Sequence, residues 1–136
     1  MNIVLDTTNI KKIAKTLEQD SRVLFAYIYG SVLNEPNPRD VDIAIHSTSD
    51  AKPNILSSDL KILLHNVTGI PPDNFDIRII NHLLQYGDIF GLLYLKNVLT
   101  SGKLISDKSP EARVEFLESY GTKFRECEGL IHEVLT

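Results

Sequence analysis

Aspartates that could bind a divalent cation occur in two short segments of this chain. Asp40 and Asp42 are separated by one residue, and Asp76 lies in a second segment with the same alternation of polar and apolar residues. Side chains along a strand alternate between the two faces of its sheet, so Asp40 and Asp42 share a face, about 7 Å apart. If the two segments pair as neighbouring strands, Asp76 comes beside them. Three carboxylates supply hard oxygen ligands, which suit Mg²⁺ rather than zinc.

Gly30 and Ser31 form a second motif, directly after the apolar run at 22–29 (RVLFAYIY). Glycine lets the backbone come close to a ligand, and free N–H groups at the start of a helix attract phosphate. Each motif also has a purely structural interpretation. An Asp-x-Asp pair is usually two solvated acids, Gly30 can simply turn the chain, and Ser31 can cap a helix. A phosphate site beside a metal site is more specific than either motif alone.

The hydrophobic periodicity predicts the elements that position these residues. We expect strands at 22–29, 40–46 and 75–80, and a short edge strand at 102–105. We expect helices after an N-cap at Thr8, near 55–67 with an end at Gly69, across 88–99, and as one long C-terminal helix from Ser109. This order of elements predicts an α+β fold, with a small mixed β-sheet of three to four strands packed with helices.

Composition narrows the class of protein. The chain has 136 residues, 43% of them hydrophobic, which is enough for one core, so we expect a single domain over 1–136. The single cysteine, Cys127, excludes an intrachain disulfide and suits a small core residue. A net charge of -4 disfavours a non-specific grip on nucleic acid. The N-terminus lacks the pattern of a signal peptide and the apolar runs are short, so we expect a cytoplasmic protein.

Taken in order, the motifs resemble those of a known family. Tyr29-Gly30-Ser31, a loop and Asp40-Val41-Asp42 are similar to the Gly-Ser…Asp-x-Asp signature of the polymerase-beta-like nucleotidyltransferase superfamily. The likeness is to its minimal branch, the MNT or MntA-type antitoxins, and runs from Val23 onward. Asp76 stands where the third acid-bearing strand is expected, and 102–105 with 111–120 (EARVEFLESY) resembles the family's ending. The loop before Asp40 is shorter than is common in this branch, and Arg39 replaces a small hydroxyl residue.

The resemblance implies a reaction and a partner. Asp40, Asp42 and Asp76 would bind two Mg²⁺ ions, with Asp76 also helping to deprotonate the attacking hydroxyl. Gly30 and Ser31 would bind the β- and γ-phosphates of ATP. The chain would then transfer AMP to a tyrosine of a HEPN-domain toxin and so act as its antitoxin. Two other functions stay open: a module that neutralises its partner by contact alone, and nucleotide transfer to a small molecule or an RNA end.

Several other residues fit structural roles better than chemical ones. The four histidines, His46, His65, His82 and His132, have no ligand spacing, although His46 shares the face of Asp40 and Asp42. Tyr27 and Tyr29 are expected in the core, and Arg39 is either a phosphate ligand or half of a surface ion pair. The last helix carries an apolar seam at Leu117, Tyr120, Phe124, Cys127, Ile131 and Val134. This seam either covers the sheet of its own domain or, in its distal half at 130–135, docks a partner.

Overall fold

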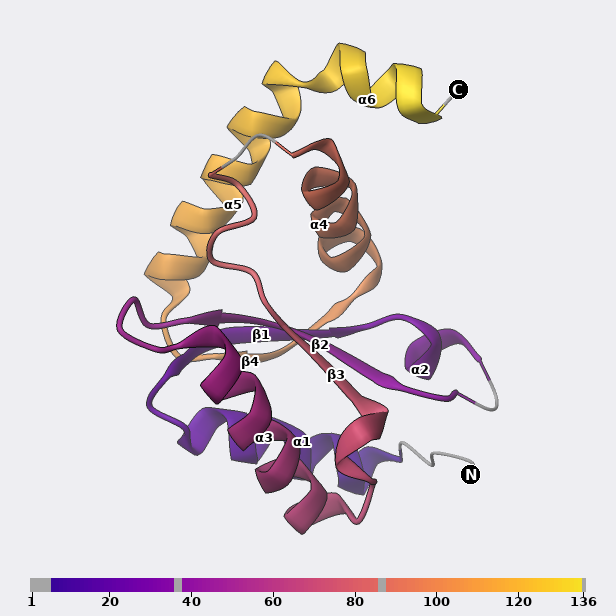
Figure 1. Cartoon of the computed structure of the whole chain (residues 1–136), viewed down its shortest axis with the longest axis vertical. Helices are drawn as coiled ribbons and strands as arrows, with labels where there is room; N and C mark the ends of the chain where they lie inside the picture. Colours follow the sequence, from indigo (N-terminus) through magenta and orange to yellow (C-terminus); the bar gives the residue numbers. More distant parts are fainter. Residues whose placement is uncertain (1–5, 36–37, 86–87, 136) are drawn as a thin grey trace.

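A computed structural model describes residues 6–35, 38–85 and 88–135 of the chain. Four strands form one sheet, and helices cover both of its faces (Figure 1). The elements are α1 (Thr7–Gln19), β1 (Val23–Tyr29), α2 (Ser31–Asn34), β2 (Val41–Ser47), α3 (Pro53–Thr68), the 3₁₀ turn η1 (Pro72–Asn74), β3 (Phe75–Ile79), α4 (Ile89–Ser101), β4 (Lys103–Asp107), α5 (Pro110–Glu126) and α6 (Glu128–Leu135). Each expected strand is therefore present, with bounds shifted by one or two residues.

The sheet has the strand order β3-β2-β1-β4, so β4 is an edge strand as its sequence predicts. β1 runs antiparallel to β2 and β4, whereas β2 and β3 are parallel. The sheet is therefore mixed, and the expected α+β class is confirmed. The parallel pair places the starts of β2 and β3 at the same end of the sheet, where β1 finishes and α2 begins.

Two hydrophobic clusters fill the two faces of the sheet. On the first face, α1 and α3 lie side by side and bury aliphatic residues such as Ile43 and Leu60 (Figure 1). On the second face, α4, α5 and α6 cover a more aromatic cluster that includes Phe25, Tyr27 and Tyr29. The two tyrosines are buried, as expected. We call this second side of the sheet the aromatic face.

The helix ends follow the capping rules, with one correction. The N-cap of α1 is Asp6, not Thr8: the Asp6 carboxylate accepts a hydrogen bond of 2.8 Å from the N–H of Asn9. Asp6 lies three residues before that N–H, which is the spacing that an N-cap carboxylate spans. Gly69 ends α3 in the left-handed conformation, and the Ser109 hydroxyl accepts from the N–H of Ala112 at the start of α5. Both of these ends were expected.

The expected long C-terminal helix is wrong, because it is divided at Cys127 into α5 and α6. After the break, α6 turns back over the end of α4 (Figure 1). The bend lets Ile131 enter the core of the aromatic face, while Leu130, Val134 and Leu135 stay exposed. Tyr120, Phe124 and Cys127 of the seam pack against this cluster, but at its start the buried residue is Phe116 and not the expected Leu117. Docking of a partner on the distal part stays a prediction.

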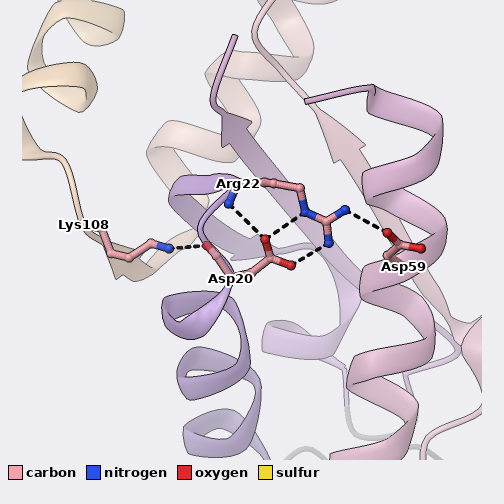
Figure 2. Close-up of polar contacts among 4 residues, drawn as sticks. All are labelled: Asp20, Arg22, Asp59 and Lys108. Carbon is pink, nitrogen blue, oxygen red and sulfur yellow. Dashed lines mark hydrogen bonds and ion pairs between the residues drawn. The ribbon is translucent and has the colours of Figure 1, made fainter. Parts of the chain in front are cut away.

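A charged cluster joins four elements at the end of the sheet where β1 begins (Figure 2). The Arg22 guanidinium donates to both carboxylate oxygens of Asp20, at 3.0 and 2.8 Å, and to Asp59 of α3 at 2.8 Å. The Lys108 ammonium donates to the backbone carbonyl of Asp20. The hydrogen bond from the Arg22 side chain lowers the pKa of Asp20. Because these charged side chains bind one another and the backbone, we interpret this cluster as structural.

No described helix is both long enough and apolar enough to cross a membrane.

Candidate active site

The turn after β1 has a conformation that requires glycine. Gly30 has a φ of 83° and a ψ of -155°, a combination that residues with a side chain very rarely adopt. A Cβ built at residue 30 would lie 2.3 Å from Oδ2 of Asp42. The Asp42 carboxylate therefore packs directly against the backbone of the turn. The structural alternative for Ser31 is wrong: Gly30 occupies the N-cap position, and Ser31 is the first residue of α2.

The two strand-borne acids lie opposite each other across the parallel pair. Asp42 of β2 is the register partner of Asp76 of β3, so both side chains leave the sheet on the aromatic face. Asp42 is half-buried and Asp76 is exposed. Tyr29 is the register partner of Asp42 on the other side. Three adjacent strands therefore bring Gly30, Asp42 and Asp76 to one end of the sheet.

Asp40 lies just outside β2 and is exposed, so the expected strand start at residue 40 is one residue too early. Its neighbour Arg39 is also exposed, and its backbone carbonyl accepts a hydrogen bond of 2.7 Å from the side chain of Asn74. Asn74 stands two residues before Asp76. This bond fastens the entry of β2 to the entry of β3, and it gives Asn74 a positioning role that sequence patterns did not indicate.

Electrostatic repulsion between the acids contributes to a raised pKa of Asp42. Its pKa is raised from the usual 3.8 to about 6, first by burial, then by the charge of Asp76 and then by that of Asp40. The three acids are therefore close enough to interact, with Asp76 the stronger neighbour. Among the described residues, no lysine or arginine forms an ion pair with any of them. Within the described part of the chain, no direct ion pair neutralises these three carboxylates.

An aromatic pair stands beside these acids. The hydroxyl oxygens of Tyr29 and Tyr94, from β1 and α4, are 2.6 Å apart, and the rings meet edge to face. Burial is the main reason why the pKa of each tyrosine is raised, and the charges of Asp42 and Asp76 act in the same direction. Both phenols are therefore neutral at pH 7. The guanidinium of Arg78, on β3, lies 4.5 Å from the centre of the Tyr94 ring.

His46 is not part of this arrangement. It sits at the other end of β2, stacked on Phe25 at 4.9 Å and in edge contact with Phe116. Burial lowers its pKa, so the imidazole is neutral at pH 7. Cavities of about 340 and 230 Å³ lie there, both lined by His46 and Asn81, and neither reaches Asp42 or Asp76. These two cavities are therefore separate from the candidate acids.

Comparison with known proteins identifies the family. The model of the family described as "Polymerase beta, Nucleotidyltransferase" matches residues 11–111. The chain belongs to the polymerase beta nucleotidyltransferase family. The match contains the Gly30–Ser31 turn and all three candidate acids, so the resemblance seen in the sequence is confirmed. No curated protein matches the chain.

Solved structures share this nucleotidyltransferase fold. A toxin–antitoxin structure with AMP-PNP aligns with a TM-score of 0.60 and 21% identity, over 94% of this chain and 99% of that chain. Two variants of the toxin–antitoxin pair MntA–HpeT align with a TM-score of 0.58 and 19% identity. In one, two aspartates are replaced by glutamates, and 93% of this chain and 98% of that chain are covered. In the other, a tyrosine is replaced by alanine, and the coverage is 98% and 100%.

The candidate acids of this nucleotidyltransferase suit a divalent cation by their chemistry. Within residues 6–35, 38–85 and 88–135, no three Asp, Glu, His or Cys side chains already form a metal-binding group. The donors are nevertheless hard carboxylates, as Mg²⁺ prefers. Asp42 is held beside the like charges of Asp76 and Asp40, and a bound cation would relieve their repulsion. By the chemistry of their oxygen donors, the three carboxylates therefore fit a divalent cation.

Proposed function

We propose that this chain is a Mg²⁺-dependent nucleotidyltransferase that moves AMP from ATP to a hydroxyl group of a partner protein. The observation that carries the proposal is the register pairing of Asp42 with Asp76, directly against the Gly30 turn, in a chain of the nucleotidyltransferase family. Two acids on neighbouring strands beside a phosphate-binding turn are the parts that phosphoryl-group chemistry needs.

The nucleotide would lie across the end of the sheet. Gly30 and Ser31 would bind the β- and γ-phosphates through backbone N–H groups of the turn, which attract anions. The absence of a Cβ at residue 30 makes room for the Asp42 carboxylate, so the turn and this acid lie directly together. Asp42 and Asp76, with Asp40 drawn in, would hold up to two Mg²⁺ ions. Bound there, the metal would supply positive charge that neutralises phosphate oxygens in the transition state. The AMP-PNP complex of a structure with the same fold supports a nucleotide as the substrate.

The transfer step needs little covalent chemistry from the protein. The acceptor hydroxyl oxygen forms a bond to the α-phosphorus as the bond from that phosphorus to the bridging oxygen of the β-phosphate breaks. Pyrophosphate leaves on the side of Gly30, and the hydroxyl proton passes to the carboxylate of Asp76 on the opposite side. Asp42, between them, would hold the cation, which would supply positive charge to the α-phosphate oxygens. Most of the rate would come from positioning and charge neutralisation.

The acceptor we propose is a tyrosine of a HEPN-domain toxin, which makes this chain an antitoxin. The support is the likeness of the fold to toxin–antitoxin structures, one of them a tyrosine variant. The exposed apolar residues of α6, Leu130, Val134 and Leu135, offer a surface for such a partner. An acceptor on a separate protein also suits the exposure of Asp40 and Asp76, because a bound protein can cover these two acids.

The decisive experiment measures transfer of label from α-³²P-ATP to a HEPN-domain toxin as the proposed partner, with and without Mg²⁺. We expect one labelled band at the mass of the toxin, lost with EDTA or when its acceptor tyrosine is changed to phenylalanine. Label from γ-³²P-ATP should not be transferred, because pyrophosphate leaves. Equal labelling from both forms of ATP would contradict nucleotidyl transfer and indicate phosphorylation or contamination.

A second function is neutralisation by contact alone. It is favoured by one observation, that the described acids do not form a ready-made group of three metal ligands. The same assay separates the two functions when toxin activity is followed in parallel. If the double variant Asp40→Asn, Asp42→Asn still silences the toxin without labelling it, binding is sufficient. If the toxin stays active, transfer is required.

A further inference from the structure

Arg78 is the basic residue nearest in sequence to Asp76, the candidate acid on β3. It stands two residues after Asp76, and the alternation of β3 places both side chains on the aromatic face, where both are exposed. An arginine in this position could close an ion pair with Asp76. Among the described residues, however, no carboxylate pairs with its guanidinium.

Arg78 stacks on an aromatic ring instead. Its guanidinium carbon lies 4.5 Å from the centre of the Tyr94 ring. Stacking uses the flat face of the guanidinium and leaves its N–H groups, which lie in the plane, free to donate. With the guanidinium over this ring and no described ion pair between it and Asp76, the carboxylate can bind a cation and the guanidinium can bind an anion.

Tyr94 is itself fixed relative to the acids. Its hydroxyl is 2.6 Å from that of Tyr29, with the ring planes at 82°. Tyr29 pairs in register with Asp42 and directly precedes Gly30. A continuous set of contacts thus runs from the phosphate-binding turn through Tyr29 and Tyr94 to Arg78. The guanidinium is tied to the same end of the sheet as the acids.

We propose that Arg78, held by Tyr94, binds a phosphate group of the nucleotide substrate. This inference rests on the proposed function. Three carboxylates repel a triphosphate, and a fixed cation beside them offsets that repulsion. The planar guanidinium matches two phosphate oxygens at once, which an ammonium does not. Arg113, which lies on the same side of the sheet, is paired with Asp107 and is therefore not available in the same way.

The test is calorimetric titration of the protein with Mg²⁺ and AMP-PNP, which is not turned over. We expect Arg78→Gln to weaken binding by about tenfold or more, the usual effect of losing a charge-assisted hydrogen bond. Arg78→Lys should restore part of the affinity. Tyr94→Phe keeps the ring under the guanidinium but removes the hydroxyl that fixes it to Tyr29, so it should weaken binding less than Arg78→Gln. Arg125→Gln, an exposed arginine of α5, is the matched control for loss of one positive charge and should have no effect.

AMP-PNP binding by the wild type and by Arg78→Gln distinguishes failure of this inference from failure of the proposed function. If wild type binds AMP-PNP and Arg78→Gln binds equally well, Arg78 has no role toward the nucleotide and the inference is overturned. If the substitution instead raises only the KM for the acceptor protein, the arginine recognises the acceptor and the inference is again wrong. If wild type itself does not bind AMP-PNP, the proposed function fails and the inference fails with it. Thermal unfolding of each variant shows whether it is folded.

Discussion

Asp42→Asn is expected to abolish nucleotide transfer while leaving the fold more stable. Asparagine keeps the shape of the side chain but removes the charge that would bind the metal. We expect the rate of transfer to fall by at least about a hundredfold, as for loss of a principal charge-stabilising group. Without metal, the same change relieves repulsion from Asp76 and Asp40, so the melting temperature should rise by a few degrees at pH 7. Activity and stability would thus move in opposite directions.

The stability gain has a characteristic pH dependence. The pKa of Asp42 is raised on folding, from 3.8 to about 6. Between these values the folded protein binds more protons than the unfolded chain, so its free energy of unfolding falls as pH rises through this window. Above the window the full cost of the ionised carboxylate is present. In Asp42→Asn the fall should be absent, and the two proteins should differ least below pH 4.

Asp50→Asn is the matched control, because Asp50 is an exposed acid in the loop after β2, at the other end of the strand. It should change neither the rate of transfer nor the melting temperature at pH 7. Melting curves followed by circular dichroism from pH 3.5 to pH 8, with EDTA present, make the comparison. A lower melting temperature for Asp42→Asn at pH 7 would show that Asp42 is stabilised by contacts and does not carry uncompensated charge.

Gly30→Ala should damage both the fold and the site. The backbone at residue 30, with φ at 83° and ψ at -155°, costs about 1–3 kcal/mol for a residue with a side chain. The added methyl group would also lie 2.3 Å from the Asp42 carboxylate and displace it. We expect lower stability and loss of most transfer activity. Urea unfolding and the labelled-nucleotide assay measure the two effects.

Gly69→Ala is the control that introduces backbone strain without displacing a neighbouring side chain. Gly69 also has a positive φ, 78°, but a Cβ there meets no atom within 4 Å. This variant should lose about 1–2 kcal/mol of stability and keep its activity. If Gly30→Ala loses no more activity than Gly69→Ala, the close packing of Gly30 against Asp42 has no catalytic importance.

Local patterns were sufficient to predict the parts of the site that lie on strands. The alternation around Asp42 and Asp76 defined their shared face, and the apolar run before Gly30 defined the buried strand that leads to the turn. The pairing of Asp42 with Asp76 could not be predicted from these patterns alone. Register depends on how the connection through α3 returns the chain to the sheet. Asp40 illustrates the limit: it follows the same alternation, yet the strand begins one residue later.

Tertiary contacts decided what patterns could not. Tyr94 lies on an expected helix, but only the packing of α4 on the sheet brings its hydroxyl to Tyr29 and its ring to Arg78. The sequence around Asn74 is that of an ordinary turn. Only the structure shows that the Asn74 side chain donates a hydrogen bond to the backbone carbonyl of Arg39, directly before Asp40. The break at Cys127 had no signal in the spacing of the apolar seam, because α6 turns where Ile131 can reach the core.

The most direct test of the site is anomalous diffraction from crystals grown with Mn²⁺ and AMP-PNP. We expect an anomalous peak for a manganese ion coordinated by Asp42 and Asp76, with the nucleotide phosphates over the backbone of residues 30 and 31. A manganese ion bound at other carboxylates, with the nucleotide in the cavities near His46 and Asp42 left without metal, would contradict it.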